Sequence, residues 1–194
     1  MEKRILSLKK LTHQLFKNGK EMTGRSRGAR IREVIEKILR DEKGSLRVII
    51  DFSRMASIDF SWADEVVAKM VSRLWSGEYG EKFLILKNLN SSQVENIDVA
   101  LERKKLAVLT TGPEGWQIIG SLNNYLVHTL NRVMRRRHLT LRELSEEEGI
   151  EMNTGGTRLL NLYKKHLVVR VERPMMKKED SHRGRQYIYQ SLLS

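Results

Sequence analysis

The chain has no cysteine among its 194 residues. Disulfide bonds and thiolate chemistry are therefore excluded, and the composition favours a reducing cytoplasm. No apolar run reaches the roughly 18 residues that a membrane span requires. The basic N-terminus is not followed by an apolar segment, so we expect no signal peptide. These absences predict a cytoplasmic protein without a membrane partner.

Sequence motifs of several enzyme classes are also missing. The five histidines are scattered, and the sequence contains no nucleophile elbow and no phosphate-binding glycine loop with its lysine. We therefore predict a protein that is not an enzyme and that needs no cofactor or metal. One enzymatic alternative stays open. It places Asp51, Asp59, Asp64 and Glu65 at one end of a sheet, where carboxylates hold hard cations.

Proline is rare as well, with two in the whole chain, and one of them suggests a division into domains. Pro113 lies in TTGPEG, residues 110–115, between two glycines. Proline and glycine interrupt helices and strands and are typical of linkers. This segment predicts a domain boundary that separates residues 1–110 from residues 113–194.

Charge of one sign is in excess. Lysine and arginine number 36 against 24 acidic residues, a net charge of +12. Residues 111–194 hold 14 basic and 9 acidic residues, and the first 110 hold 22 and 15, so both halves are basic. Such an excess favours a nucleic-acid partner, and an acidic protein partner is the alternative.

The N-terminal half alternates apolar runs with helical patterns. Residues 46–52 and 83–88 are short, nearly continuous apolar runs, as in strands buried on both faces. We expect a further strand near residues 4–10 and an edge strand in KKLAVLT, residues 104–110. Apolar residues at helical spacing predict helices within 28–40, 62–75 and 91–104. This alternation predicts an α/β fold.

The stretch DFSRMASIDFSWADEV, residues 51–66, has several interpretations. Ser61 stands before an amphipathic helix with Asp64 three positions on, which is the spacing of a capping box. Asp51 and Asp59 suit turns at strand ends. The alternatives are a catalytic pair and a phosphorylation switch at Asp59, Ser61 and Asp64.

The phrases VIIDFSRMASIDFSWADEVVAKMV and FLILKNLNSSQVENIDVALERK resemble the STAS-like domain of unknown function, over roughly residues 28–104. This family is related to the STAS domains of anti-sigma-factor antagonists. The resemblance implies a STAS-type α/β fold that regulates through protein contacts, with an ATP-binding kinase-like protein as the implied partner. The place of the phosphorylatable serine of antagonists is held by Phe60, and Ser61 follows it.

The C-terminal half has a different pattern. We expect a long helix over 117–137, and a capping box in which Thr140 pairs with Glu143. Gly149 should end a short helix, and Asn153 should cap the next, near 153–165. Strands are expected at 168–173 and in QYIYQSL, residues 186–192. Three helices and a two-stranded ribbon predict an α+β winged helix-turn-helix domain.

The segment GTRLLNLYKKHLVVRVE resembles the recognition helix and first wing strand of many prokaryotic winged-helix regulators, and the resemblance covers about residues 117–192. With Leu159, Leu160 and Tyr163 inward, the outer face carries no acid and offers groups that reach bases or phosphates. The predicted DNA-binding residues on the helix are Thr154, Thr157, Arg158, Asn161, Lys164 and Lys165. Those on the wing tip are Lys177, Lys178, Arg183 and Arg185. Gly155 and Gly156 suggest close packing of the helix start.

The sequence as a whole predicts a prokaryotic regulator of transcription in which a STAS-like domain controls a domain that binds double-stranded DNA. A homodimer is the expectation for a palindromic site, although no coiled-coil heptad is present. The first alternative is a partner-switch regulator that acts only through protein contacts. The second is the metal-dependent enzyme that would use the acidic residues near 51–65.

Overall fold

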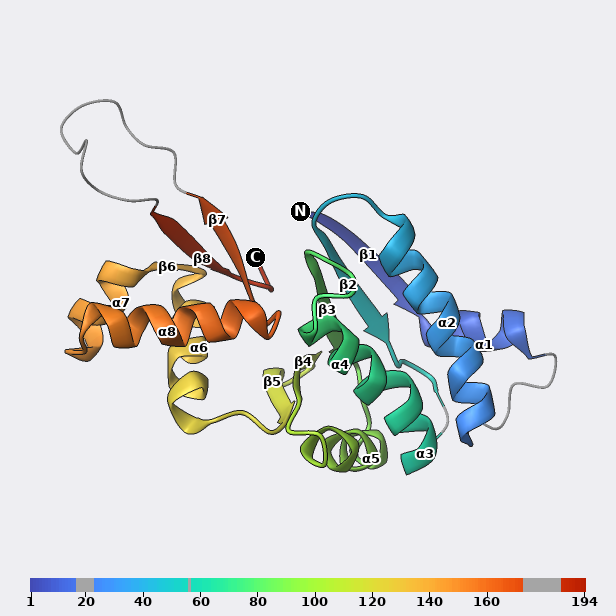
Figure 1. Cartoon of the computed structure of the whole chain (residues 1–194). Coiled ribbons are helices and arrows are strands. Elements are labelled where there is room, and N and C mark those ends of the chain that lie inside the picture. Colours follow the sequence, from blue (N-terminus) through green and yellow to red (C-terminus); the bar gives the residue numbers. More distant parts are fainter. Residues whose placement is uncertain (17–22, 56, 173–185) are drawn as a thin grey trace. The chain divides into compact units, whose positions relative to one another are not determined.

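The computed structural model describes residues 1–16, 23–55, 57–172 and 186–194 (Figure 1). The chain divides into two compact units, Met1–Leu122 and Asn123–Ser194. Within the described ranges, no helix is both long and apolar enough to cross a membrane.

The N-terminal unit is built on a five-stranded sheet in the order β1-β2-β3-β4-β5. Strands β1 (Glu2–Ser7), β2 (Leu46–Asp51), β3 (Lys82–Lys87) and β4 (Ala107–Gly112) are parallel, and β5 (Gly115–Gly120) is antiparallel to β4. This mixed, mostly parallel sheet confirms the α/β prediction. The expected strand at 4–10 lies earlier, because Ser7 caps α1 (Leu8–Leu15).

Helices connect the parallel strands. These are α2 (Arg25–Asp41), then α3 (Phe60–Ala63) with the π-helical turn η1 (Asp64–Ala68) and α4 (Lys69–Trp75), then α5 (Ser91–Glu102). The parallel strands follow sequence order, so right-handed connections place these helices on one face. Figure 1 shows α2 and α4 side by side there. Alternate strand residues such as Val48, Leu84 and Val108 form one core with the fully buried Trp62.

The segment expected to separate the domains forms a tight hairpin instead. Gly112 pairs with Gly115 across the turn that holds Pro113, and β5 then runs back along β4. Gly115 has φ +109°, a conformation that glycine adopts at no steric cost. Residues 117–120, the expected start of the helix over 117–137, therefore belong to β5 of the N-terminal sheet. The compact units divide at Leu122 rather than near residue 110.

The C-terminal unit combines helices α6 (Asn124–Arg136), α7 (Leu141–Glu148) and α8 (Met152–Lys164) with a small antiparallel sheet. The sheet has the order β6-β8-β7, from β6 (His138–Thr140), β7 (Val168–Glu172) and β8 (Tyr187–Ser191). The predicted strands at 168–173 and 186–192 are confirmed, and the α+β class with them. Strand β6 was not predicted, because three residues give no periodic pattern.

Candidate functional site

Helix α8 is held in place by the way the chain enters it. Thr140 and Glu143 form the predicted capping box of α7, in which the Thr140 N–H donates to the Glu143 carboxylate at 2.7 Å. Gly149, with φ +61°, ends α7 as expected. Asn153 is not the cap of α8, because the helix begins one residue earlier, at Met152 after Glu151. Residues 149–151 therefore connect α7 to α8.

The two glycines of α8 have different surroundings. A Cβ at Gly155 would lie 2.9 Å from the Ser145 Oγ and 3.0 Å from a Leu141 methyl carbon, so α8 approaches α7 closely there. A Cβ at Gly156 would meet Leu141 at 3.6 Å, an ordinary contact. The expected close packing is thus present at Gly155.

These surroundings predict opposite results for two similar substitutions. Gly155→Ala should destabilise the C-terminal unit by about 1–3 kcal/mol through overpacking. Gly156→Ala should be neutral or stabilise it by up to about 1 kcal/mol, because alanine is the better helix former. Thermal melts followed by far-UV circular dichroism would compare the two variants. Equal losses would show that α7 and α8 are not in close contact at Gly155.

The face of α8 that points to solvent carries most of the predicted DNA-binding residues. Thr154, Thr157 and Lys164 are exposed, and Asn161 is half-buried beside them. The helix contains no aspartate or glutamate. The buried residues are Leu159, Leu162 and Gly155, whereas Leu160 and Tyr163, expected inward, lie at the borders. Hydroxyl, amide and ammonium groups therefore share one acid-free surface.

Arg158 and Lys165 differ from the prediction that they project from this surface. The Arg158 guanidinium donates to the Glu148 carboxylate at 2.9 Å and lies 5.6 Å from the centre of the Tyr125 ring. Lys165 is half-buried, and this burial lowers the pKa of its ammonium group. The helical pattern alone did not show that both positions are at the flank of the exposed face.

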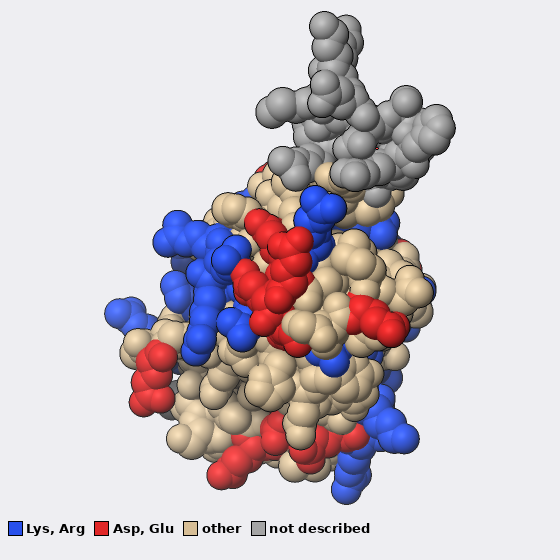
Figure 2. Space-filling model, turned by 90° about the vertical axis from the view of Figure 1, so that its left-hand side faces the viewer, with Lys and Arg blue, Asp and Glu red and all other residues tan. Residues whose placement is uncertain are grey.

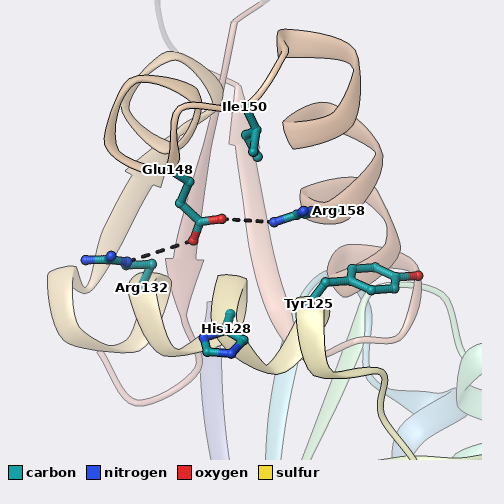
Figure 3. Close-up of a pocket in the computed structure, with 6 residues that line it drawn as sticks. All are labelled: Tyr125, His128, Arg132, Glu148, Ile150 and Arg158. Carbon is teal, nitrogen blue, oxygen red and sulfur yellow. Dashed lines mark hydrogen bonds and ion pairs between the residues drawn. The ribbon is translucent and has the colours of Figure 1, made fainter.

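A cavity of about 510 Å³ adjoins Arg158 (Figure 3). The close-up shows the Glu148 carboxylate between Arg132 of α6 and Arg158 of α8. The Arg132 Nε lies 3.8 Å from Glu148. Sequence reasoning missed this cavity, although the spacing of its α6 residues was a usable indication of a shared face. The lining residues are Tyr125, His128, Arg132, Glu148, Ile150 and Arg158.

The strands that follow α8 are tied to it by an arginine between two aromatic rings. The Arg170 guanidinium of β7 lies 4.3 Å from the centre of the Tyr163 ring and 4.4 Å from that of Tyr187 in β8. Such cation–π contacts add to packing. They fix the base of the β7–β8 hairpin against the end of α8. Its predicted DNA-binding tip, Lys177, Lys178, Arg183 and Arg185, lies outside the described residues.

Basic and acidic groups alternate on the surface of the C-terminal unit. Arg136 of α6 pairs with Glu147 of α7 at 2.6 Å, and Arg142 pairs with Glu146 within α7. Figure 2 likewise shows blue and red groups next to each other on the face that it presents. Four acidic residues lie on α7, which are Glu143, Glu146, Glu147 and Glu148, whereas α8 contains none. The charge pattern thus distinguishes one helix from the other.

The predicted switch residues lie where the helical segment α3–η1–α4 begins. Asp59, not Ser61, is the N-cap: one carboxylate oxygen accepts from the Trp62 N–H at 2.7 Å and the other from the Gly24 N–H at 3.0 Å. The capping box expected from Ser61 and Asp64 is therefore wrong, because the helix starts at Phe60. Asp59 joins the beginnings of two helices, α2 and α3, and Ser61 lies half-buried in the first turn.

This geometry predicts unequal effects at the two positions. Asp59→Ala should lower the free energy of unfolding of the N-terminal unit by about 1–2 kcal/mol, and Ser61→Ala should change it by no more than about 0.5 kcal/mol. All three tryptophans of the chain lie within residues 1–122. Denaturant melts followed by tryptophan fluorescence therefore report this unit alone. A larger loss of unfolding free energy for Ser61→Ala than for Asp59→Ala would show that Ser61 is the helix cap.

The acidic residues near 51–65 are engaged by other side chains. Asp64 pairs with Lys104 and with Arg25 at 3.4 Å. Asp51 accepts from the Ser53 hydroxyl at 2.7 Å and from the Asn88 amide at 3.0 Å. Burial alone would raise the pKa of the Asp51 carboxyl, but these hydrogen bonds lower it overall. No group of three or more histidine or acidic residues suited to a metal ion occurs in the described part of the chain.

Glu36 and Glu65 belong to a buried cluster of charged side chains in the N-terminal unit. Glu36 is 1% exposed and accepts from Tyr79 at 2.7 Å, from Arg73 at 2.8 Å and from Arg32 at 2.8 Å. Arg32 also donates to Glu65 at 3.2 Å, joining α2 to η1. Burial alone would raise the pKa of Glu36, but the Tyr79 and Arg32 hydrogen bonds and the arginine charges lower it overall.

Comparison with known proteins identifies no family for the chain. No family model matches the chain, and no curated protein matches it in sequence.

Proposed function

We propose that the chain is a regulator whose C-terminal unit, Asn123–Ser194, is a winged helix-turn-helix domain that binds duplex DNA. Helix α8 is the reading element in this proposal, and the β7–β8 hairpin is the wing. The observation that carries it is the acid-free face of α8 with exposed Thr154, Thr157 and Lys164, on a helix locked by a capped α7 and a close glycine contact. Such a face offers the groups that contact base edges and phosphates.

The N-terminal unit serves as a STAS-like protein-interaction domain in the same proposal. Its mostly parallel sheet with helices on one face agrees with the fold that the sequence resemblance implies. Next to Asp59 and Ser61, Phe60 lies under the Arg103 guanidinium, 4.7 Å from the ring centre. Aromatic and arginine side chains are enriched at protein interfaces. This region around α3 is the surface that would receive a partner, and the domain would transmit that contact to the DNA-binding unit.

A selection of duplexes from a random pool, followed by variant titrations, tests the assignment of α8. Asn161→Ala should lose about 1–3 kcal/mol of discrimination between selected and random DNA, since asparagine pairs with adenine. Lys164→Ala should weaken both duplexes alike and flatten the slope of log K against log salt by about 1, because lysine neutralises a phosphate.

Lys37→Ala supplies the matched control, because Lys37 is an exposed lysine on α2 of the other unit. It removes the same charge and should alter binding less than Lys164→Ala. If the two lysine variants weaken DNA binding equally, then α8 does not contact DNA. If the pool yields no preferred sequence, and Asn161→Ala binds DNA as the parent chain does, then α8 does not recognise bases.

A further inference from the structure

Arg158 lies at the edge of the acid-free face of α8. Thr154 precedes it by four residues and Asn161 follows it by three, so all three share one side of the helix. Thr154 is exposed and Asn161 is half-buried. The Arg158 side chain is 21% exposed and points into the cavity of Figure 3. The cavity therefore adjoins the surface assigned to DNA.

The cavity has the composition of an anion site that already holds an anion. Arg158 reaches the Glu148 carboxylate at 2.9 Å and Arg132 approaches its other oxygen at 3.8 Å. His128 and Tyr125 line the same space. A carboxylate and a phosphate both accept charge-assisted hydrogen bonds from guanidinium groups. Glu148 is 14% exposed and is the single acid among the lining residues.

Building on the proposed function, we propose that this cavity is a subsite for one backbone phosphate of duplex DNA, and that the Glu148 carboxylate occupies the phosphate position when no DNA is bound. Arg158 exchanges Glu148 for the phosphate on binding. Glu148 is thus an intramolecular competitor that lowers the affinity for DNA of any sequence. Phosphate contacts carry no base information, so the competitor leaves discrimination at Asn161 unchanged.

Two neighbouring glutamates of α7 supply a matched pair of variants. Glu148→Gln removes the competing charge and keeps the side-chain shape. Glu147→Gln removes the same charge one residue away, from a glutamate that pairs with Arg136 and does not line the cavity. Because both variants raise the net charge equally, long-range attraction to DNA cancels in the comparison.

Titration of a random duplex with the full chain measures the effect. Glu148→Gln should bind about tenfold more tightly than the parent chain at low salt, since a hydrogen bond between charged groups no longer has to be broken. The slope of log K against log salt should stay unchanged, because Arg158 contacts the same phosphate in both complexes. Glu147→Gln should change the affinity by less than about twofold, because exposed ion pairs contribute little.

The double variant Glu148→Gln with Arg158→Ala tests whether Arg158 is the group released. The gain should disappear in this chain, and thermal melts of all variants would show that each remains folded. Equal affinities of the Glu148 and Glu147 variants, or a gain that persists without Arg158, would overturn the proposal while leaving DNA binding intact. Binding by none of the chains would instead remove the proposed function, and the subsite with it.

Inorganic phosphate, added without DNA, distinguishes a free ligand from the DNA backbone. Under the proposal, millimolar phosphate should raise the melting temperature of Glu148→Gln by no more than it raises that of Glu147→Gln. A single phosphate lacks the other contacts of the duplex. A selective stabilisation of Glu148→Gln by phosphate, together with unchanged duplex affinity, would overturn the proposal in favour of a site for a small phosphorylated molecule.

Discussion

Replacing Glu36 by alanine should lower the free energy of unfolding of the N-terminal unit by about 3–5 kcal/mol. The carboxylate is almost fully buried and accepts hydrogen bonds from Arg32, Arg73 and Tyr79. Arg32 is 8% exposed, so losing Glu36 leaves its charge buried, with Glu65 as the acidic partner that remains among the described residues. Tryptophan fluorescence during urea unfolding would measure the loss.

A glutamate from the same segment is the control. Glu42 follows α2 and pairs with Arg4 at the surface, where both side chains are partly exposed. Glu42→Ala should therefore cost no more than about 1 kcal/mol. A cost for Glu36→Ala as small as that for Glu42→Ala would contradict the view that the buried cluster joins α2 to the segment η1–α4.

Lowering the pH should destabilise the N-terminal unit through the same cluster. The pKa values of Glu36 and Glu65 are lowered, since hydrogen bonds and neighbouring charges outweigh the effect of burial. Groups with lowered pKa stabilise the fold above their unfolded pKa, about 4.3 for glutamate, and this stabilisation is lost as the pH falls through the folded value. Urea midpoints should therefore fall as the pH is lowered below about 4.3. The fall should be shallower in Glu36→Ala, and an identical pH dependence in both chains would contradict this.

Gly120→Ala should destabilise the N-terminal unit by at least about 3 kcal/mol, from a strained backbone and overpacking together. Gly120 has φ +89°, and a Cβ there would lie 2.2 Å from the Leu106 carbonyl oxygen. Its N–H donates to the Asp98 carboxylate at 2.6 Å. The glycine ends β5 where the chain leaves the sheet, so a backbone shift is the only relief.

Gly112→Ala is the corresponding control at the other end of the hairpin. Gly112 lacks a positive φ, and nothing lies within 4 Å of a Cβ at this position. Tryptophan fluorescence should show a large shift of the urea midpoint for Gly120→Ala and little change for Gly112→Ala. A Gly120→Ala chain as stable as the parent would mean that β5 does not end against Leu106.

The sequence predicted the elements that have a strong local pattern. The apolar runs at 46–52 and 83–88 became β2 and β3, and the Thr140–Glu143 spacing became a capping box. Side chains that alternate or recur at fixed steps reveal which face is buried, and both patterns are local.

Other features depend on tertiary contacts that no local pattern contains. Pro113 suited a linker and a hairpin turn equally, and its pairing partner, β4, decided the outcome. Ser61 and Asp59 are both good caps, and the helix start at Phe60 selected Asp59. The spacing placed Arg158 on the outer face, but its side chain instead donates a hydrogen bond to Glu148, ten residues earlier. The cavity depends on residues from three segments that meet only in the folded unit.

Binding of a labelled random duplex by the intact chain, measured by fluorescence anisotropy across a salt series, tests whether the C-terminal unit is a DNA-binding domain. We expect saturable binding at low salt, with log K falling linearly with log salt by about 0.9 for each phosphate that a lysine or arginine neutralises. We also expect Lys164→Ala to weaken this binding more than Lys37→Ala does. Absence of binding at low salt would show that the C-terminal unit does not bind DNA, and it would then be a module for protein contacts in a partner-switch regulator.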